Sequence, residues 1–196
     1  MKVIDVIKGE NAYTIGYTEE LAELEKKAKV LCYEFNQTSP SEDDKRSKII
    51  KELVGTYDES VHIEPTFRCD YGFNIHFHGF ALINYNCVIL DTSPVHIGKN
   101  AFIAPGVCIA CAGHSIHPEQ RIWVDTSAPI TLEDNVWIGA NATICGGVTI
   151  GEGSVIGAGS VVVKDIPKGV VAAGNPCRVI RKITEKDIVE VTFKQE

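Results

Sequence analysis

Apolar residues in the first third of the chain recur at intervals of three and four, with charged residues between them. This spacing is typical of an amphipathic helix that buries one stripe of its surface. It predicts a helix from Thr18 to Phe35. The apolar stripe consists of Leu21, Leu24, Ala28, Leu31, Cys32 and Phe35.

A second helix start follows shortly after the first helix ends. Ser39 can cap, Pro40 suits the first helical position, and Glu42 stands where a capping box needs an acidic residue. The helix should run to about Val54. We therefore expect an N-terminal helical segment at residues 1–58, with a structural role or, as the alternative, a role as the lid or wall of a binding pocket.

After residue 60 the helical spacing gives way to a period of six residues. An aliphatic residue fills one position of each hexapeptide, and a small or acidic residue usually follows it. Such a repeat describes a chain that winds round a triangular prism, with three short strands per coil and the aliphatic side chains inside. The aliphatic positions are Ile97, Ile103 and Ile109, then Leu132, Ile138, Ile144, Ile150, Ile156 and Val162.

The same rhythm is held earlier by Phe77, Ile83 and Ile89. A two-residue insertion at Pro94 and Val95 then resets the phase. Since a coil takes three hexapeptides, we expect residues 18 apart to lie above one another at the strand spacing of about 4.8 Å. No segments long enough for crossover helices separate the strands, which argues against a doubly wound sheet. The sequence predicts a mainly β fold, with a parallel β-helix at residues 59–166 and a short C-terminal cap at 167–196.

One long interruption separates the two runs of the repeat, between Ile109 and Leu132. We expect an excursion loop at residues 112–129, which includes two histidines and Trp123. Long loops that leave a regular scaffold often carry binding and catalytic residues. The functional site is therefore expected beside this loop.

Composition excludes several classes of partner. The 19 basic and 26 acidic residues give a formal charge of −7, which opposes binding to nucleic acids and anionic membranes. No apolar run is long enough to span a bilayer, and residues 1–13 lack the apolar core of a secretory signal. Seven cysteines, an odd number scattered through apolar segments, indicate free thiols in a reducing compartment. We expect a cytoplasmic protein.

Short motifs spread over nearly the whole chain are highly specific when they occur together. They are Ile63-Glu64-Pro65, Phe67-Arg68-Cys69-Asp70-Tyr71-Gly72, Asn74-Ile75, Ala104-Pro105-Gly106-Val107, Gly113-His114, Asn135-Val136-Trp137-Ile138-Gly139, Gly147-Val148-Thr149-Ile150-Gly151 and Lys164-Asp165-Ile166-Pro167. With them the chain resembles the maltose, galactoside and nodulation-type O-acetyltransferases of the hexapeptide-repeat superfamily. The resemblance implies a left-handed β-helix and a homotrimer with active sites between subunits. It also implies transfer of acetyl from acetyl-CoA to a hydroxyl of a small sugar, such as maltose, glucose or a galactoside, without a metal.

The resemblance also assigns residues to the reaction. An alcohol attacks a thioester slowly unless a base removes its proton, and neutral histidine is the usual base near pH 7. His114 matches the family's catalytic histidine. Asn84 and Asp70 match acceptor-pocket residues, with Asn84 expected to orient the attacking hydroxyl as part of catalysis. Asp91 is a third candidate for binding the acceptor.

The coenzyme is expected along the prism surface. By resemblance, a backbone N–H near Gly139 and Ala140 stabilises the negative charge that forms on the thioester oxygen. Cations should meet the coenzyme phosphates, and small or apolar residues should line the pantetheine arm. These further cofactor-binding candidates are Lys164, Arg178, Arg181, Ala158 and Val163.

The acceptor stays open because two regions depart from the family pattern. Residues 13–17 lack the acidic residue that some members use against the acceptor, and the loop around Trp123 is unlike that of the best-known members. An antibiotic, a nucleotide-linked amino sugar or serine is an alternative acceptor. A non-catalytic scaffold is a further alternative, although His114 argues against it.

The sequence also contains partial patterns for two other chemistries. Cys108 and Cys111 have the spacing of redox and zinc sites, but without a second pair we interpret them as packing residues, and no cysteine falls in the histidine motif to support an acetyl-cysteine route. A column of His76, His96 and His114 could make a zinc-dependent hydratase. The 20-residue separation of the first two, instead of 18, argues against such a column.

Overall fold

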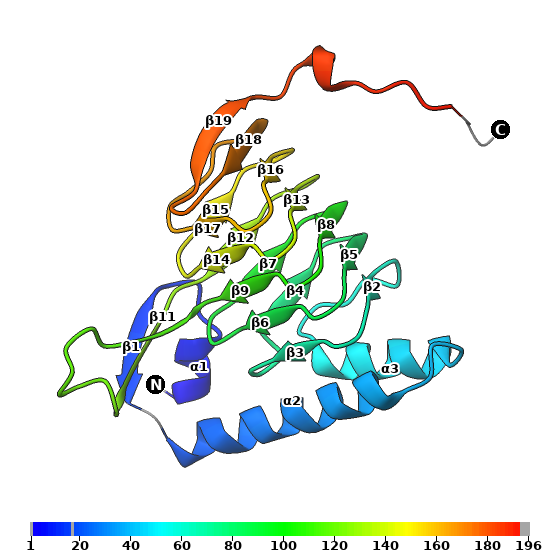
Figure 1. Cartoon of the computed structure of the whole chain (residues 1–196). Coiled ribbons are helices and arrows are strands. Elements are labelled where there is room, and N and C mark those ends of the chain that lie inside the picture. Colours follow the sequence, from blue (N-terminus) through cyan, green and yellow to red (C-terminus); the bar gives the residue numbers. More distant parts are fainter. Residues whose placement is uncertain (1, 17, 193–196) are drawn as a thin grey trace.

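Three parallel sheets wind around a common core to form a triangular prism (Figure 1). The computed structural model describes residues 2–16 and 18–192. The first face of the prism contains β4 (Ile75–Phe77), β7 (Val95–Ile97), β12 (Ile130–Leu132) and β15 (Thr149–Ile150). The second contains β2 (His62–Ile63), β5 (Ala81–Ile83), β8 (Ala101–Ile103), β13 (Trp137–Ile138), β16 (Val155–Ile156), β18 (Val170–Ala173) and β19 (Arg178–Lys182). The third contains β3 (Arg68–Cys69), β6 (Val88–Leu90), β9 (Cys108–Ala110), β14 (Thr143–Cys145) and β17 (Val161–Val162).

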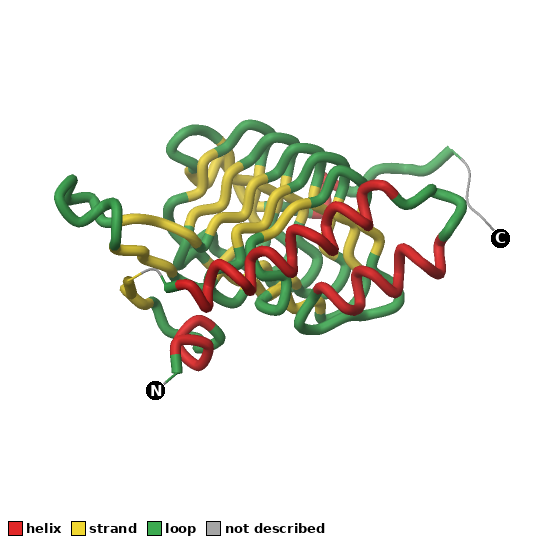
Figure 2. Tube along the Cα trace, turned by 90° about the horizontal axis from the view of Figure 1, so that it is seen from below, coloured by secondary structure: helices red, strands yellow, loops and turns green. Residues whose placement is uncertain are grey.

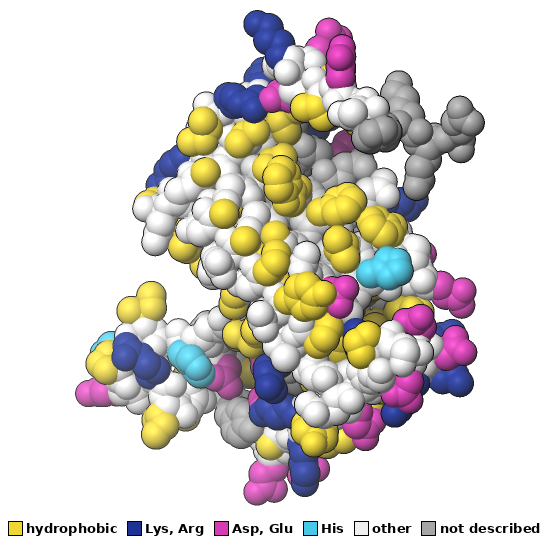
Figure 3. Space-filling view, turned by 45° about the vertical axis from the view of Figure 1, so that its right-hand side comes forward, with side chains coloured by type: hydrophobic (Ala, Val, Ile, Leu, Met, Phe, Trp, Pro, Cys, Tyr) yellow, Lys and Arg dark blue, Asp and Glu magenta, His cyan; other side chains and the backbone are white. Residues whose placement is uncertain are grey.

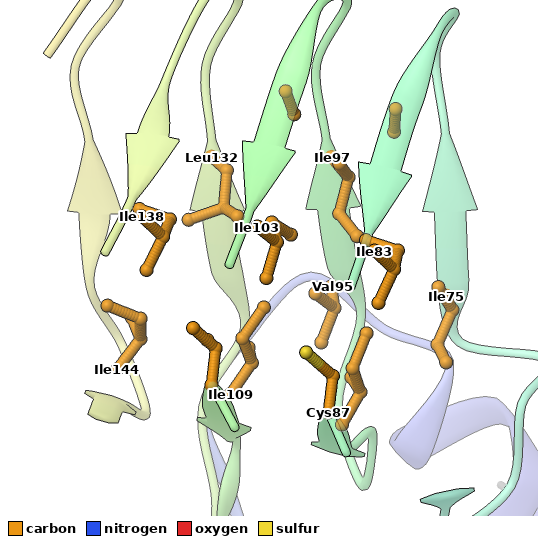
Figure 4. Close-up of a cluster of buried hydrophobic side chains, with 14 of the residues drawn as sticks. Ile75, Ile83, Cys87, Val95, Ile97, Ile103, Ile109, Leu132, Ile138 and Ile144 are labelled. Carbon is orange, nitrogen blue, oxygen red and sulfur yellow. The ribbon is translucent and has the colours of Figure 1, made fainter. Parts of the chain in front are cut away.

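The aliphatic position of each hexapeptide points into the prism, as the repeat predicts. Side chains from all three faces fill one continuous core (Figure 4). From Phe77 to Val162, each predicted core position is at most 2% exposed. The parallel β-helix therefore follows from the burial of one residue in six along the chain.

The spacing between stacked residues differs along the prism. In the later coils, residues 18 apart are partners, as in Leu132 and Ile150. In the early coils the partners are 20 apart, as in Phe77 and Ile97, so the expected 18-residue spacing is wrong there. The reason is that the corner between the third and first faces is longer in two successive coils, at residues 70–74 and 91–94. Because both coils carry a long corner, they still stack in register.

Two helices cover the N-terminal end of the prism. They are α2 (Glu19–Gln37) and α3 (Asp43–Leu53), which lie side by side in Figures 1 and 2. Phe35 from α2 and Leu53 from α3 join the prism core, so the helices shield the first coil from water. The helix expected at residues 18–35 is therefore present with slightly different ends. None of the described helices is long and apolar enough to cross a membrane.

The second helix begins later than the capping pattern predicts. Residues 39–42 form a turn, in which the Glu42 N–H donates to the Ser39 carbonyl oxygen at 3.0 Å. The Glu42 carboxylate accepts the Ser39 N–H at 3.2 Å, but the Ser39 hydroxyl pairs with Ser41 instead of capping the helix. Only half of the predicted capping box forms, and the prediction of Pro40 as the first helical residue is wrong.

The excursion forms an antiparallel hairpin that is joined by a strand from the N-terminal segment. The hairpin strands are β10 (Ala112–His114) and β11 (Val124–Ser127), and β1 (Tyr13–Gly16) pairs with the outer edge of β11. A short helix, α1 (Val3–Ile7), precedes β1. The segment predicted as helical therefore also supplies a strand. That strand's partner lies more than a hundred residues away, so local periodicity does not indicate it.

The C-terminal end of the prism is closed by a hairpin. Strand β18 pairs in parallel with β16, so regular stacking continues past residue 166 into the segment predicted as a cap. Strand β19 then returns antiparallel to β18, and a short 3-10 helix follows at Glu185–Asp187. Residues 193–196 of the predicted cap lie outside the described residues.

Candidate active site

A cavity of about 210 Å³ lies where the excursion hairpin, β1 and α2 approach the prism. Its wall combines hydroxyl, carboxylate and imidazole groups with the apolar side chains of Ile15 and Leu21. The polar lining residues include Tyr13, Glu25, Asp70, Thr92, His114 and Asp125. Such a mixture of polar and apolar groups is typical of a small-molecule site.

His114 is held by a carboxylate across the hairpin. Pairing of β10 with β11 sets His114 opposite Asp125, and the His114 Nδ1 lies 3.0 Å from the Asp125 Oδ1. The imidazole is 65% exposed and borders the cavity instead of the prism core. A carboxylate at Nδ1 favours the tautomer with hydrogen on Nδ1, which leaves the Nε2 lone pair free to accept a proton.

Asp70 lies across the same cavity, on the corner that follows β3. Burial, and then the nearby carboxylates of Asp91 and Glu25, raise the pKa of Asp70 to about 7, against a smaller opposing effect of Lys29. The Asp70 carboxyl can thus be either an acceptor or a donor of hydrogen bonds near neutral pH. Glu25 itself is paired with Lys29 at 2.8 Å on α2.

Asp91 is a structural residue in this chain. Its carboxylate is fully buried and accepts the backbone N–H groups of Asp70, Tyr71 and Asn74 at 2.9–3.2 Å. Burial raises the pKa of Asp91 to about 6, against the opposing effect of these hydrogen bonds. This placement leaves Asp91 no path to a bound acceptor, so the expectation of direct acceptor contact is corrected. Asp91 instead holds the corner that carries Asp70.

Asn84 lies elsewhere on the chain. It follows β5 at a corner between the second and third faces, and its Oδ1 accepts the Tyr85 N–H at 2.8 Å. Among the described residues that line the His114 cavity, Asn84 is absent. A single chain therefore brings Asp70 to His114 but does not bring Asn84 there.

Three further histidines form a stack on the first face. The rings of His76 and His96 are 5.1 Å apart and those of His78 and His96 are 5.3 Å apart. His76 and His96 are direct strand partners, so their separation of 20 residues does not keep them from stacking, and the sequence expectation is wrong on this point. His114 lies on the hairpin and does not join them. Within residues 2–16 and 18–192, no three His, Cys, Asp or Glu side chains are arranged to hold a metal ion.

Comparison with known proteins decides the family. The profile of bacterial transferase hexapeptide (six repeats) matches residues 129–164, and that of the maltose acetyltransferase hexapeptide capping motif matches residues 12–58. The galactoside O-acetyltransferase of Escherichia coli (strain K12) is 49% identical over 86% of this chain and 84% of its own length. The chain belongs to the hexapeptide-repeat acetyltransferases.

Solved structures of hexapeptide-repeat acetyltransferases share this architecture over most or all of the chain. A galactoside acetyltransferase in complex with coenzyme A has a TM-score of 0.89 and 44% identity, covering 100% of this chain and 99% of that one. A maltose O-acetyltransferase from Clostridium difficile 630 has a TM-score of 0.82 and 44% identity, covering 87% of this chain and 93% of that one. These similarities confirm the predicted left-handed β-helix and an acetyl-CoA-dependent acetyltransferase.

The two proposed oxyanion donors of this acetyltransferase differ in availability. The Gly139 N–H already donates to the Ile156 carbonyl oxygen at 2.7 Å. A Cβ at Gly139 would lie 2.6 Å from the Ala158 nitrogen, so close stacking of coils explains the glycine. The Ala140 N–H makes no hydrogen bond within the described part of the chain. Of the two candidates, Ala140 is the one with a free donor.

The predicted coenzyme cations lie toward the C-terminal end of the prism. Lys164 is exposed, as are Ala158 and Val163. The Arg178 guanidinium donates to the Cys177 carbonyl oxygen at 2.7 Å, and Arg181 makes a two-pronged ion pair with Asp187 at 2.6 and 2.9 Å. That pair holds the pKa of Asp187 at about 2. In Figure 1, strand β19, which carries Arg178 and Arg181, lies at the opposite end of the prism from the hairpin that carries His114.

Sequence reasoning assigned no role to several residues of the cavity. Asp125 lies eleven residues after His114, and only the register of the hairpin pairs them. The Tyr13 hydroxyl donates to the Thr92 carbonyl oxygen at 2.6 Å, which fixes the tyrosine ring against the prism. Glu25 lies on α2 among the residues of the apolar stripe, and the helical spacing does not assign it to a cavity. These residues become visible only when the N-terminal segment is docked on the prism.

Proposed function

We propose that this acetyltransferase moves the acetyl group of acetyl-CoA to a hydroxyl of a small sugar, with His114 as the general base. The observation that carries the proposal is the His114–Asp125 pair, which borders a polar cavity of about 210 Å³. Similarity to proteins named galactoside and maltose O-acetyltransferases supports a sugar as the acceptor. Maltose, glucose and galactosides are the first acceptors to test.

The reaction follows from the two ends of the imidazole. The Asp125 carboxylate accepts the Nδ1–H of His114, so that Nε2 removes the proton from the sugar hydroxyl as its oxygen attacks the thioester carbonyl carbon. The carbonyl oxygen then carries negative charge, which the free N–H of Ala140 is suited to stabilise. When the C–S bond breaks, the imidazolium returns its proton to the coenzyme sulfur. The products are the acetyl ester and free coenzyme A.

The acceptor is expected to lie between His114 and Asp70. Asp70 can hold sugar hydroxyls in either protonation state, and Tyr13 and Glu25 offer further polar groups on the same wall. Asn84 stays a candidate for orienting the attacking hydroxyl. Lys164, Arg178 and Arg181 stay candidates for the coenzyme phosphates, with Ala158 and Val163 along the pantetheine arm.

A homotrimer with active sites between subunits would bring together side chains that lie apart in a single chain, such as His114 and Asn84. The second face exposes an apolar stripe in which Leu82 is followed by the half-exposed rings of Phe102 and Trp137, and hydrophobic side chains gather over this part of the surface in Figure 3. At the tip of the hairpin, Ile116 and Ile122 are 91% and 92% exposed. Apolar surface of this kind is expected to be covered by another subunit. Sedimentation velocity tests this assembly.

We further propose that the enzyme works in the cytoplasm. All seven cysteines are free thiols, which suits a reducing compartment. Localisation of a tagged full-length chain in its native cell tests this directly.

The activity is tested by thiol release from acetyl-CoA against a panel of glucosides, galactosides, maltose and amino sugars. We expect sugar-dependent release of coenzyme A and an acetyl ester on the sugar. The control is the His114→Ala variant, which should lose the sugar-dependent rate. No turnover with any sugar in the panel would contradict the proposed acceptor class.

A further inference from the structure

Two buried thiols face each other between α2 and the first strand of the third face. The Cys32 Sγ on α2 lies 3.6 Å from the Cys69 Sγ on β3, and both side chains are almost completely buried. Other buried thiols point at backbone oxygens, as Cys87 does toward Ala104 and Cys111 toward Pro94. Within the described residues, Cys32 and Cys69 are the one pair of thiols in contact.

The two thiols differ in acidity in a way that suits oxidation. A hydrogen bond from Cys69, followed by smaller effects that include the charge of Arg68, lowers the pKa of Cys32 despite burial. The same hydrogen bond, together with burial, raises the pKa of Cys69. The thiolate is the nucleophilic form of cysteine, so Cys32 is suited to attack and Cys69 to resolve.

A small oxidant can reach the pair. Both cysteines line a cavity of about 280 Å³, together with Lys29, Arg68 and Asp70. Hydrogen peroxide is a small neutral molecule that such a cavity admits. The thiols are therefore buried from bulk water but adjacent to a space from which they can react.

The pair is also next to the acceptor cavity. Asp70 follows Cys69 directly and lines both cavities. On α2, Lys29 of this cavity pairs with Glu25 of the acceptor cavity at 2.8 Å. A disulfide requires a sulfur separation of about 2.05 Å, so the two sulfurs must approach by about 1.5 Å. Helix α2, which carries Cys32, and the corner that follows Cys69 both line the acceptor cavity.

We propose that Cys32 and Cys69 are an oxidation site, at which hydrogen peroxide forms a disulfide that displaces one wall of the acceptor cavity. The Cys32 thiolate attacks one peroxide oxygen, the O–O bond breaks, and hydroxide leaves, which gives a sulfenic acid on Cys32. The Cys69 thiol then attacks that sulfur, loses its proton, and the sulfenic oxygen leaves as water. Two thiols and one peroxide become one disulfide and two waters, with the sulfurs oxidised and the peroxide reduced. The effect on catalysis rests on the proposed function, but the bond itself does not.

The covalent step is tested on the full-length, reduced protein treated with hydrogen peroxide. Intact mass should fall by two hydrogen atoms, and peptide mapping should link the Cys32 peptide to the Cys69 peptide. In Cys69→Ser, dimedone should trap the sulfenic acid on Cys32. The Cys32→Ser and Cys32→Ala variants should form no link, whereas the matched Cys87→Ser variant should form it as the wild type does. Absence of the link in folded wild-type protein, or a link between other cysteines, would overturn the proposal.

The consequence for the acceptor cavity has a separate readout. Oxidised wild type should lose at least about tenfold in kcat/KM for the acceptor, since displacing a positioning group by about 1 Å can cost roughly 10²-fold. Dithiothreitol should restore the rate, and Cys32→Ala should keep its rate under peroxide. A disulfide that leaves the rate unchanged would overturn the displacement of the cavity wall. If no sugar is turned over at all, the mass measurement still decides whether the oxidation site exists.

Discussion

The histidines of the excursion hairpin and of the first prism face have different surroundings. His114 has one ring nitrogen at the Asp125 carboxylate and borders a cavity with the rest of its ring. In the stack, both nitrogens of His96 have partners: Nδ1 lies 3.1 Å from the His78 Nε2, and Nε2 lies 3.0 Å from Glu10. The first arrangement leaves a lone pair for chemistry, whereas the second uses both nitrogens for structure.

The stacked histidines His76, His78 and His96 have a structural role instead of a catalytic one. Burial, followed by the neighbouring His96 and His78, lowers the pKa of His76, which favours its neutral form. Through Glu10 the stack holds the loop before β1 against the prism, and β1 forms part of the acceptor cavity. His114 thus differs from His96 in having a ring nitrogen that borders a cavity and has no hydrogen-bond partner within the described residues, and the following predictions test that difference.

Replacing His114 has the largest expected effect. His114→Ala should lower kcat by about 10² to 10⁴, the usual contribution of a general base. Steady-state kinetics with acetyl-CoA and the best sugar measure this. The matched control is His117→Ala, an exposed histidine on the same hairpin, which should keep its rate. Equal losses in the two variants would mean that the hairpin, and not the imidazole, matters.

Removing the charge beside His114 comes next. Asp125→Asn should lower kcat by about 10- to 100-fold, less than the roughly 10⁴ seen when a buried triad carboxylate is changed. The smaller effect is expected because the Asp125 side chain is 32% exposed and water can partly replace it. Asp125→Glu should recover part of the rate. An unchanged kcat in Asp125→Asn would show that the tautomer does not depend on the carboxylate.

The raised pKa of Asp70 predicts that the stability of the protein changes with pH. Its pKa in the folded protein is raised to about 7, so its contribution to stability is fully present below its unfolded pKa near 3.8 and is lost as pH rises through about 7. Asp70→Asn removes this loss because the amide does not ionise. The free energy of unfolding of the variant, relative to that of wild type, should therefore be about 2 kcal/mol higher at pH 8 than at pH 5. Urea unfolding at the two pH values measures the difference. An equal effect at both would contradict the raised pKa.

Changing the stack should have the smallest effect. His96→Gln should reduce the free energy of unfolding by about 1 kcal/mol, because one or two partly exposed hydrogen bonds are lost. Its kcat should stay near that of wild type, since no stack residue lines the His114 cavity within the described chain. A loss of kcat as large as that of Asp125→Asn would erase the distinction between the two groups of histidines.

Much of the prism could be predicted from the sequence, because an aliphatic residue recurs at every sixth position and each such residue is buried. Corner lengths could not, since the 20-residue stacking of Phe77 on Ile97 depends on two long corners matching each other. His114 and Asp70 were recognisable from motifs, but the Asp125 partner depends on hairpin register. Asp91 was misjudged because a carboxylate that binds backbone N–H groups inside a corner has no distinct sequence signal.

The most direct test of His114 as the base is the pH dependence of kcat/KM for the acceptor in wild type and His114→Ala. In wild type the rate should fall with unit slope on the acid side, as the imidazole takes up a proton and can no longer accept one from the sugar. In His114→Ala the residual rate should lack this acid limb. The same acid limb in both enzymes, and again when each also carries Asp70→Asn to remove the carboxyl of raised pKa, would contradict the account, because another group would then be removing the proton.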